Sequence, residues 1–402
     1  KNQQAMPGVE LRLYDNQNMS TVLTATNGLF SFENLVLGMS CTLQPYKNDD
    51  LLNGVTTYDL VLVTRHILGT QIFNSPYQYI AADINNSGTI TTFDVVNLRK
   101  AILLISDEFP GNTSWRFIRS GYQFPNPADP FEQTLPESAW LQNLSYDAVA
   151  MNFIGVKIGD INGNAVAGFN GGLNDREGEG ELPFFAEEAQ LKKGETARVP
   201  VFADAHQNIA ALQMTIQFDP ALLALEGMEG AAISAKEHNS GQPRPGYLTF
   251  SWETVEGQVI EPGMPLFYLQ FQVLENTTIS QALAINSTMT PAIAYKMGGD
   301  PLNILWRIHE APQRPVDAAH LFSLAQNRPN PFSSQSTIGF VLKQNMPVKL
   351  EVSDVTGRRW LLLDEELAAG YHEVPVNGGE VAKPGLYFYQ LATPFGEEQR
   401  ER

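Results

Sequence analysis

The residues with the clearest chemical potential lie between positions 83 and 94, in the stretch DINNSGTITTFD. Calcium takes six to eight oxygen ligands, and a 12-residue loop supplies them from positions 1, 3, 5, 7 and 12, with glycine at position 6 for the sharp turn. The corresponding residues here are Asp83, Asn85, Ser87, the carbonyl of Thr89, and Asp94. We therefore predict a Ca²⁺ site in this loop. A solvated polar turn is the alternative.

The same pattern occurs a second time in the chain. Residues 48–68 align with residues 83–103 at an offset of 35, which pairs Asp59 with Asp94. Matching residue types at one fixed offset indicate an internal repeat, and each copy predicts a polar loop followed by an amphipathic helix.

The loop of the first copy departs from this pattern at its centre. With Asp59 as the last ligand, Asn48 and Asp50 fall at positions 1 and 3. Leu52 then occupies position 5, where calcium needs an oxygen. The five-oxygen set is incomplete here.

A segment far downstream offers the missing oxygens. The stretch DINGN at 160–164 is similar to the opening half of the loop at position 83, and no helix pattern follows it. We hypothesise that this segment folds back and supplies or supplements the ligands of a site with Asp59, through Asp160, Asn162 and Asn164. An Asx-rich turn is the alternative.

The repeated loop-and-helix unit resembles dockerin domains, the calcium-dependent modules that bind cohesins. The resemblance rests on the Asp in place of Glu at loop position 12 and on the single helix that follows each loop. It implies a protein partner with a cohesin-like domain. The residues that it implies for partner recognition are Thr57, Tyr58 and Arg65 in the first copy, and Thr92, Phe93, Arg99 and Lys100 in the second. The aromatic Tyr58 and Phe93 depart from the usual small polar pair.

The elements around these loops are expected to be mostly strands. The length of 402 residues predicts two to four domains at about 150 residues each. The 32 glycines and 25 prolines favour many short strands and turns over long helices. We predict a mainly β, multidomain protein with β-sandwich modules and one small α-helical dockerin-like calcium-binding domain.

Shifts in composition divide the chain into four modules and two linkers. The predicted divisions are 1–47 (a partial β-domain), 48–165 (dockerin-like, with an insertion), 166–182 (linker), 183–310 (β-sandwich), 311–320 (linker) and 321–402 (a last β-domain). Through FSFENLVLG, the first module resembles prealbumin-like or B-type repeats of bacterial surface proteins. Through KKGETARVPVFADAHQNIAALQMTIQFDPALLAL, the larger sandwich resembles cohesins and related carbohydrate-binding sandwiches.

The last module resembles the C-terminal sorting domain of the type IX secretion system. The matching stretches are NRPNPF at 327–332, VSDVTGRR at 352–359, GYHEV at 370–374 and KPGLYFYQL at 383–391. The resemblance implies contact with the type IX secretion machinery, and a secreted or outer-membrane-attached location at the cell surface.

Composition excludes several other classes of protein. A formal net charge of −18 argues against nucleic acid or an anionic membrane as a partner. The single cysteine, Cys41, excludes an intrachain disulfide. No apolar run approaches the roughly 18 residues of a transmembrane helix. Six aromatic residues of the insertion are expected to form a core of irregular loops, with a polysaccharide-binding platform as the alternative: Trp115, Phe117, Tyr122, Phe124, Phe131 and Trp140.

The sequence offers no catalytic constellation. The six histidines are scattered without ligand spacing, and no nucleophile motif occurs. We predict a non-catalytic, calcium-stabilised structural or interaction protein with roles in adhesion or filament formation. Its dockerin-like and cohesin-like modules would pair between copies of the chain or within one chain. The alternative is the accessory region of a secreted enzyme, such as a glycoside hydrolase or a protease, whose catalytic domain precedes residue 1.

Overall fold

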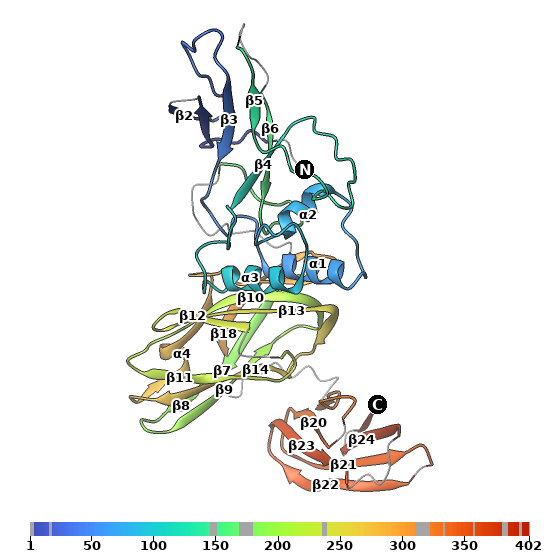
Figure 1. The fold of residues 1–402 in the computed structure, drawn as a ribbon. Helices are drawn as coiled ribbons and strands as arrows, with labels where there is room; N and C mark the ends of the chain where they lie inside the picture. Colours follow the sequence, from blue (N-terminus) through green and yellow to red (C-terminus); the bar gives the residue numbers. More distant parts are fainter. Residues whose placement is uncertain are drawn as a thin grey trace.

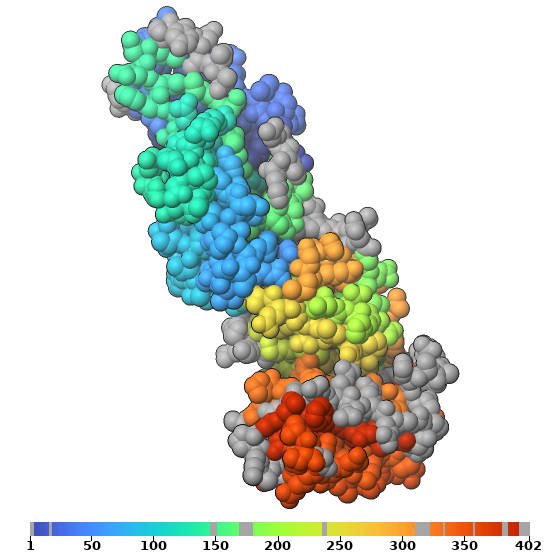
Figure 2. Space-filling model, turned by 90° about the vertical axis from the view of Figure 1, so that its right-hand side faces the viewer, coloured from blue at the N-terminus to red at the C-terminus, as the bar shows by residue number. Residues whose placement is uncertain are grey.

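Strands dominate the computed structural model, which confirms the prediction of a mainly β, multidomain protein. The structure describes residues 4–15, 18–144, 151–168, 180–234, 239–309, 322–332, 334–356, 358–379, 385–393 and 396–401. The predicted linker 311–320 and most of the linker 166–182 lie outside the described residues. A small sheet, a layer of helices and a large β-sandwich follow one another along the molecule (Figure 1), and the space-filling view shows the same succession of colours (Figure 2).

An antiparallel sheet of strand order β2-β1-β3-β5 forms the first of these layers. Its strands are β1 (Glu10–Tyr14), β2 (Met19–Leu23), β3 (Cys41–Tyr46) and β5 (Ala139–Leu141). The inward-facing Leu11 and Leu43 pack in one cluster with Trp115 and Phe117 of β4 (Trp115–Arg119), which pairs antiparallel with β6 (Phe153–Lys157). A small sheet needs such a cover for its apolar face. Strands of the insertion therefore complete the N-terminal module across the predicted boundary at residue 47.

Three helices form the middle layer. They are α1 (Thr57–Ile67), α2 (Pro76–Ala82) and α3 (Thr92–Ile102). The repeat accounts for the matched ends of α1 and α3, because Asp59 and Asp94 occupy the third helical position and close equivalent capping boxes. Their apolar stripes, with Leu60 and Leu98 fully buried, share one core. Within the described residues, no helix is long and apolar enough to cross a membrane.

The large sandwich begins with β7 and contains the main core of the protein. Its strands pair in the order β11-β14-β9-β7-β18-β17-β10-β13-β12, and β16 adds to β10. The strands are β7 (Gly180–Glu187), β9 (Thr196–Ala203), β10 (Gln207–Phe218), β11 (Leu223–Gly230), β12 (Ser240–Arg244), β13 (Tyr247–Ile260), β14 (Pro265–Val273), β16 (Leu283–Asn286), β17 (Ile293–Lys296) and β18 (Pro301–His309). A short pair, β8 (Gln190–Leu191) with β15 (Thr277–Thr278), precedes the single turn of α4 (Ile279–Ala282).

The C-terminal residues form a second, smaller sandwich with its own core around Phe340 and Leu350. One sheet has the order β19-β20-β23 and the other has the order β22-β21-β24-β25. The strands are β19 (Phe322–Leu324), β20 (Gln335–Leu342), β21 (Met346–Asp354), β22 (Arg359–Leu367), β23 (Gly370–Asn377), β24 (Tyr387–Thr393) and β25 (Gly396–Glu401).

The helical core generates a direct stability prediction. Leu98→Ala removes a side chain that is 0% exposed, and we expect a loss of about 2–5 kcal/mol in the free energy of unfolding of the helical unit. The neighbouring Val96→Ala, at a side chain that is 41% exposed, should cost no more than about 0.5 kcal/mol. Denaturant unfolding followed by circular dichroism measures both. Equal losses would contradict the assignment of the buried stripe.

Candidate functional site

The loop at residues 83–94 wraps its own backbone around two buried carboxylates. Asp83 accepts hydrogen bonds from the backbone N–H groups of Ser87 (2.8 Å) and Gly88 (2.9 Å). Asp94, at the start of α3, accepts one from the backbone of Ile84 (3.0 Å). Both carboxylates are fully buried, and burial raises the pKa of Asp83. These hydrogen bonds hold the two ends of the loop together, with the Asp83 and Asp94 carboxylates on its inner side.

The remaining predicted ligands of this loop are all oxygen donors. The side-chain oxygen of Asn85 accepts from the Ser87 N–H (3.2 Å), and the Ser87 hydroxyl donates to the Thr89 carbonyl (3.2 Å). Among the described residues, no three His, Cys, Asp or Glu side chains converge at one point. The donor set consists instead of two carboxylates with amide, hydroxyl and carbonyl oxygens, which suits a hard cation.

Residues 160–165 reproduce the first half of this loop against Asp59. Asp160 accepts hydrogen bonds from the backbone N–H groups of Gly163 (2.9 Å) and Ala165 (2.7 Å), as Asp83 does from its own loop. Asp59 accepts one from the backbone of Ile161 (2.9 Å), in the way that Asp94 accepts from Ile84. The structure therefore brings together the two segments that were expected to share a site.

The junction between these two segments is closely fitted. A Cβ atom on Gly54 would lie 2.7 Å from the Cβ of Ala165, so only glycine fits there. Beside it, the Asn53 side chain accepts from the Val166 N–H (3.0 Å) and donates to the Val166 carbonyl (2.9 Å). These contacts join the end of the 160–165 segment to the residues that precede α1, so the two segments form one split loop.

Asn48 and Asp50 have other surroundings than those expected from the sequence. The side-chain oxygen of Asn48 accepts from the Ser114 N–H (2.8 Å) at the start of β4. Asp50 adopts a positive φ of 44°, and its carbonyl accepts from the Asn53 N–H (3.0 Å) in a turn. The hydrogen bonds to the Asp59 carboxylate come instead from the 160–164 segment and from Thr56.

A buried lysine at the end of β6 lies beside the split loop. Lys157 is 4% exposed, and its ammonium donates to the carbonyl of Leu51 (2.8 Å). Burial lowers the pKa of Lys157 to about 7, although Asp160 acts in the opposite direction. Burial and the neighbouring Asp160 raise the pKa of Asp59. Both effects indicate a site with little access to water, where burial disfavours the charged form of each group. For Asp59, the cost of the negative charge would be reduced by a bound cation.

Some of the residues predicted for partner recognition contact the outer face of the large sandwich. Thr57, the first residue of α1, donates its backbone N–H to the side-chain oxygen of Gln213 on β10 (2.7 Å). Its hydroxyl lies 3.0 Å from the same oxygen and 2.8 Å from the hydroxyl of Ser251 on β13. All three side chains are buried, with exposed fractions of 0–2%. Hydrogen bonds in such a dry place impose a definite register on the helix.

Two further residues of α1 extend this contact. The Tyr58 ring stacks on Tyr295 of β17, with centroids 5.3 Å apart and planes at 23°. Arg65, in the last turn of α1, donates to the carbonyl of Val255 (3.2 Å). The ring–ring contact continues the apolar core of the helices into the sandwich, because Ile293 and Tyr295 belong to the same buried cluster as Leu60.

Helix α3 touches the same sheet through its C-terminal end. Arg99 forms an ion pair with Glu253 of β13. Burial raises the pKa of Glu253, and the nearby guanidinium of Arg99 opposes the rise. The Thr249 hydroxyl donates to the carbonyl of Leu103 (2.7 Å), which lies just past the helix. Groups of the sandwich thus pair with both the Arg99 guanidinium and the backbone carbonyl of Leu103.

The recognition residues implied by the sequence divide into two groups. Thr57, Tyr58, Arg65 and Arg99 contact the sandwich of the same chain, whereas Thr92, Phe93 and Lys100 are exposed. The receiving face was not predicted from the sequence; it comprises Gln213, Thr249 and Ser251. These three occupy outward positions of β10 and β13, where polar residues are ordinarily taken to face water. The only sequence signal for a covered face is that these side chains are small or uncharged.

The comparisons with known proteins concern the large sandwich. A Cohesin domain family model matches residues 184–294. No curated protein sequence matches the chain. The match and the fold support a cohesin-like β-sandwich, a type of non-catalytic interaction module.

Several solved structures resemble parts of the chain. A non-cellulosomal cohesin from Archaeoglobus fulgidus has 18% identity and a TM-score of 0.25, over 32% of this chain and 88% of that one. The cohesin CaCohA2 from Clostridium acetobutylicum has 15% identity and a TM-score of 0.26, over 34% and 94%. A type I cohesin–dockerin complex from Clostridium thermocellum has 11% identity and a TM-score of 0.27, over 34% and 99%.

The contact between helices and sandwich can be tested at a single glycine. A Cβ on Gly241 of β12 would lie 2.7 Å from the backbone carbonyl of Leu103. We expect Gly241→Val to separate α3 from the sheet and to increase the radius of gyration in small-angle X-ray scattering. Gly227→Val is the matched control, because a Cβ there meets no atom within 4 Å. An unchanged radius in Gly241→Val would contradict the observed packing.

Proposed function

We propose that this protein is a non-catalytic, calcium-stabilised structural and protein-interaction protein of the extracellular space or the cell surface. Its dockerin-like helical unit docks on the cohesin-like sandwich of its own chain. The observation that carries the proposal is the buried contact of Thr57 with Gln213 and Ser251, at positions that the dockerin resemblance implies for cohesin recognition. The Cohesin match of residues 184–294 supports the assignment of the receiving surface to a cohesin-like sandwich.

The internal contact makes the middle of the molecule a single rigid unit. An apolar core runs from α1 into β17, and this shared packing opposes hinge motion between the helices and the sandwich. Such a unit suits a spacer that holds other modules at a fixed distance. The same two surfaces could pair between neighbouring copies by exchange of the helical unit, and this would extend the unit into an assembly. The resemblance of residues 321–402 to a sorting domain supports export to the cell surface.

Calcium is the second part of the proposal. One ion would be held by Asp83, Asn85, Ser87, the Thr89 carbonyl and Asp94. A second would be held in the split loop by Asp160, Asn162, Asn164, Asp59 and the carbonyl of Gly54, which aligns with Thr89 in the repeat. Bound Ca²⁺ would neutralise the buried carboxylates of each loop. The protein contributes the oxygen donors and the backbone N–H groups that hold each carboxylate in place.

The stoichiometry of calcium binding tests this assignment. Isothermal titration of the chelator-treated chain should give two ions per chain, and Asp94→Asn and Asp59→Asn should each remove one. Saturation at 100 times the dissociation constant should add about 2.7 kcal/mol to the free energy of unfolding per site. The exposed Asp364→Asn should still bind two ions. One ion in the wild type, or two in Asp59→Asn, would disprove the split site.

A further inference from the structure

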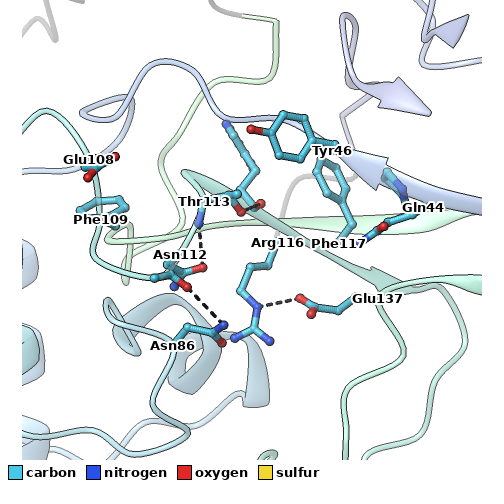
Figure 3. Close-up of a pocket in the computed structure, with 13 residues that line it drawn as sticks. Gln44, Tyr46, Asn86, Glu108, Phe109, Asn112, Thr113, Arg116, Phe117 and Glu137 are labelled. Carbon is cyan, nitrogen blue, oxygen red and sulfur yellow. Dashed lines mark hydrogen bonds and ion pairs between the residues drawn. The ribbon is translucent and has the colours of Figure 1, made fainter. Parts of the chain in front are cut away.

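A cavity of about 400 Å³ opens between the small N-terminal sheet and the helical layer. It lies where β3 ends, and the loop 108–113 and the first residues of β4 form its other walls (Figure 3). Its volume falls within the range of about 300–1,000 Å³ that is typical of small-molecule sites. None of the residues that dock on the large sandwich lines it, so it is independent of the interface described above.

The cavity contains a buried cationic donor. The Arg116 side chain is 10% exposed, and its Nε donates to the Glu137 carboxylate (2.6 Å). Its buried Nη1 has no hydrogen-bond partner among the described residues. Figure 3 shows the guanidinium reaching between Glu137 and Asn86. A buried N–H of a charged group is costly to leave unpaired, so a ligand oxygen would be held strongly there.

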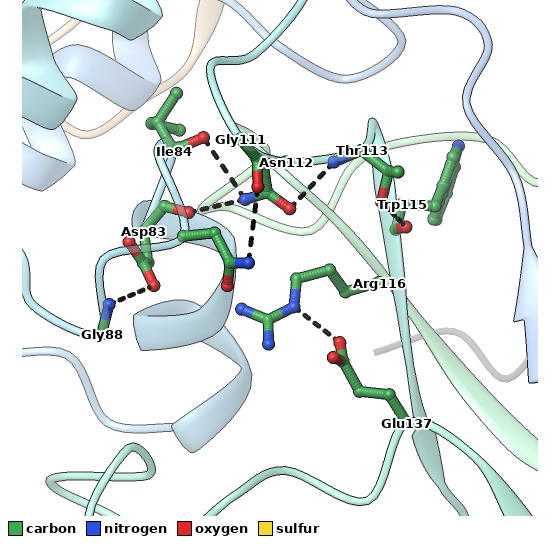
Figure 4. Close-up of polar contacts among 10 residues, drawn as sticks. Asp83, Ile84, Gly88, Gly111, Asn112, Thr113, Trp115, Arg116 and Glu137 are labelled. Carbon is green, nitrogen blue, oxygen red and sulfur yellow. Dashed lines mark hydrogen bonds and ion pairs between the residues drawn. The ribbon is translucent and has the colours of Figure 1, made fainter.

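The Trp115 ring forms part of the cavity wall but adds no donor beside Arg116. Trp115 is 6% exposed and packs in the apolar core under the small sheet. Successive residues of a strand point to opposite faces, and Figure 4 shows the indole nitrogen turned away from the Arg116 guanidinium. The buried N–H of Arg116 is therefore the donor that a ligand oxygen would satisfy.

The walls of the cavity are held in place before any ligand arrives. The Asn112 amide donates to the carbonyls of Asp83 (2.9 Å) and Ile84 (3.3 Å), and its oxygen accepts from the Thr113 N–H (2.9 Å). Asn86 donates to the carbonyl of Gly111 (3.4 Å). These bonds tie the loop 108–113 to the loop at position 83 (Figure 4). A preformed site of this kind loses little entropy when it binds a ligand.

The chemistry of the lining points to a sugar. The lining includes two carboxylates, Glu108 and Glu137, against the single guanidinium of Arg116, and this balance disfavours phosphate or another anion. The exposed amide of Gln44 and the phenol of Tyr46 add neutral donors and acceptors. Groups that both give and accept hydrogen bonds beside aromatic rings match a neutral polyhydroxylated molecule.

An exposed aromatic residue extends this surface. Trp140 on β5 is 65% exposed, and its register partner on β3 is Thr42, two residues before Gln44. Residues two apart on a strand point to the same face, so Trp140 is a diagonal neighbour of Gln44 on the outer side of the sheet. Its ring offers a flat surface on which a further sugar unit can stack.

We propose that this cavity binds a neutral carbohydrate, with one unit against Arg116 and Gln44 and the chain continuing over Trp140. Of the six aromatic residues of the insertion, Trp115 and Phe117 are buried in the core and Trp140 faces solvent. The proposed surface is therefore a cavity with one flanking ring, rather than an exposed row of rings.

Affinity electrophoresis of the full chain in gels that contain soluble β-glucan, xylan, galactomannan or pectin tests the proposal. We expect at least one neutral polysaccharide to retard the wild type. Arg116→Met should weaken binding about 10-fold or more, because it removes the charged donor. Gln44→Ala and Trp140→Ala change exposed side chains, so they keep the test valid if Arg116→Met does not fold. Each should weaken binding several-fold.

Ile72→Ala is the matched control, since its side chain is 58% exposed and does not line the cavity. It should bind like the wild type. The proposal would be overturned if no polysaccharide retards the wild type or if the cavity variants bind normally. Retardation by pectin alone would overturn the neutral class in favour of an acidic saccharide. Selection of a peptide from a random library, with loss in the cavity variants, would assign the cavity to peptides instead.

Discussion

The arrangement of the protein depends on the burial of the outer face of β10 and β13 under two short helices. Helices of 11 residues are marginal on their own, so their stability comes from packing. The sheet receives them with buried polar side chains that are hydrogen-bonded to the helices, as Gln213 is to Thr57. A buried polar contact gives little net energy, but its geometry is demanding. The apolar stacking of Tyr58 on Tyr295 therefore provides attraction, and the polar contacts set the register.

The loops connect this interface to the rest of the helical unit. Asp59 closes the capping box of α1 and accepts from the 160–164 segment, and Thr57 is two residues before it. The residue that orients the helix is thus joined to a segment about 100 residues later in the chain. Helices α2 and α3 and the antiparallel pair of β4 and β6 all lie between these two segments in the chain. A cation in the split loop would stabilise the whole unit through one site.

Much of this could be predicted from local patterns in the sequence. The ligand spacing of residues 83–94, the offset of 35 and the alternation within β10 are all short-range signals. The pairing of Asp59 with residues 160–164 could be hypothesised because DINGN repeats the start of DINNSG. The receiving face could not be predicted, because a polar residue at an outward strand position, such as Gln213, gives the same alternating pattern whether water or a helix covers it. The completion of the first sheet by β5 also escaped prediction, since a three-residue strand carries almost no periodicity.

The central claim is that the helices and the sandwich form one rigid unit, and a distance measurement tests it most directly. Spin labels at Lys100→Cys on α3 and Glu226→Cys on β11 occupy exposed positions, whereas the native Cys41 is buried. Pulsed electron–electron double resonance should give one narrow distribution of the distance between the two labels. A Gly-rich linker of the length of residues 166–182 would by itself allow separations that vary by about 20 Å. A broad distribution would contradict the account.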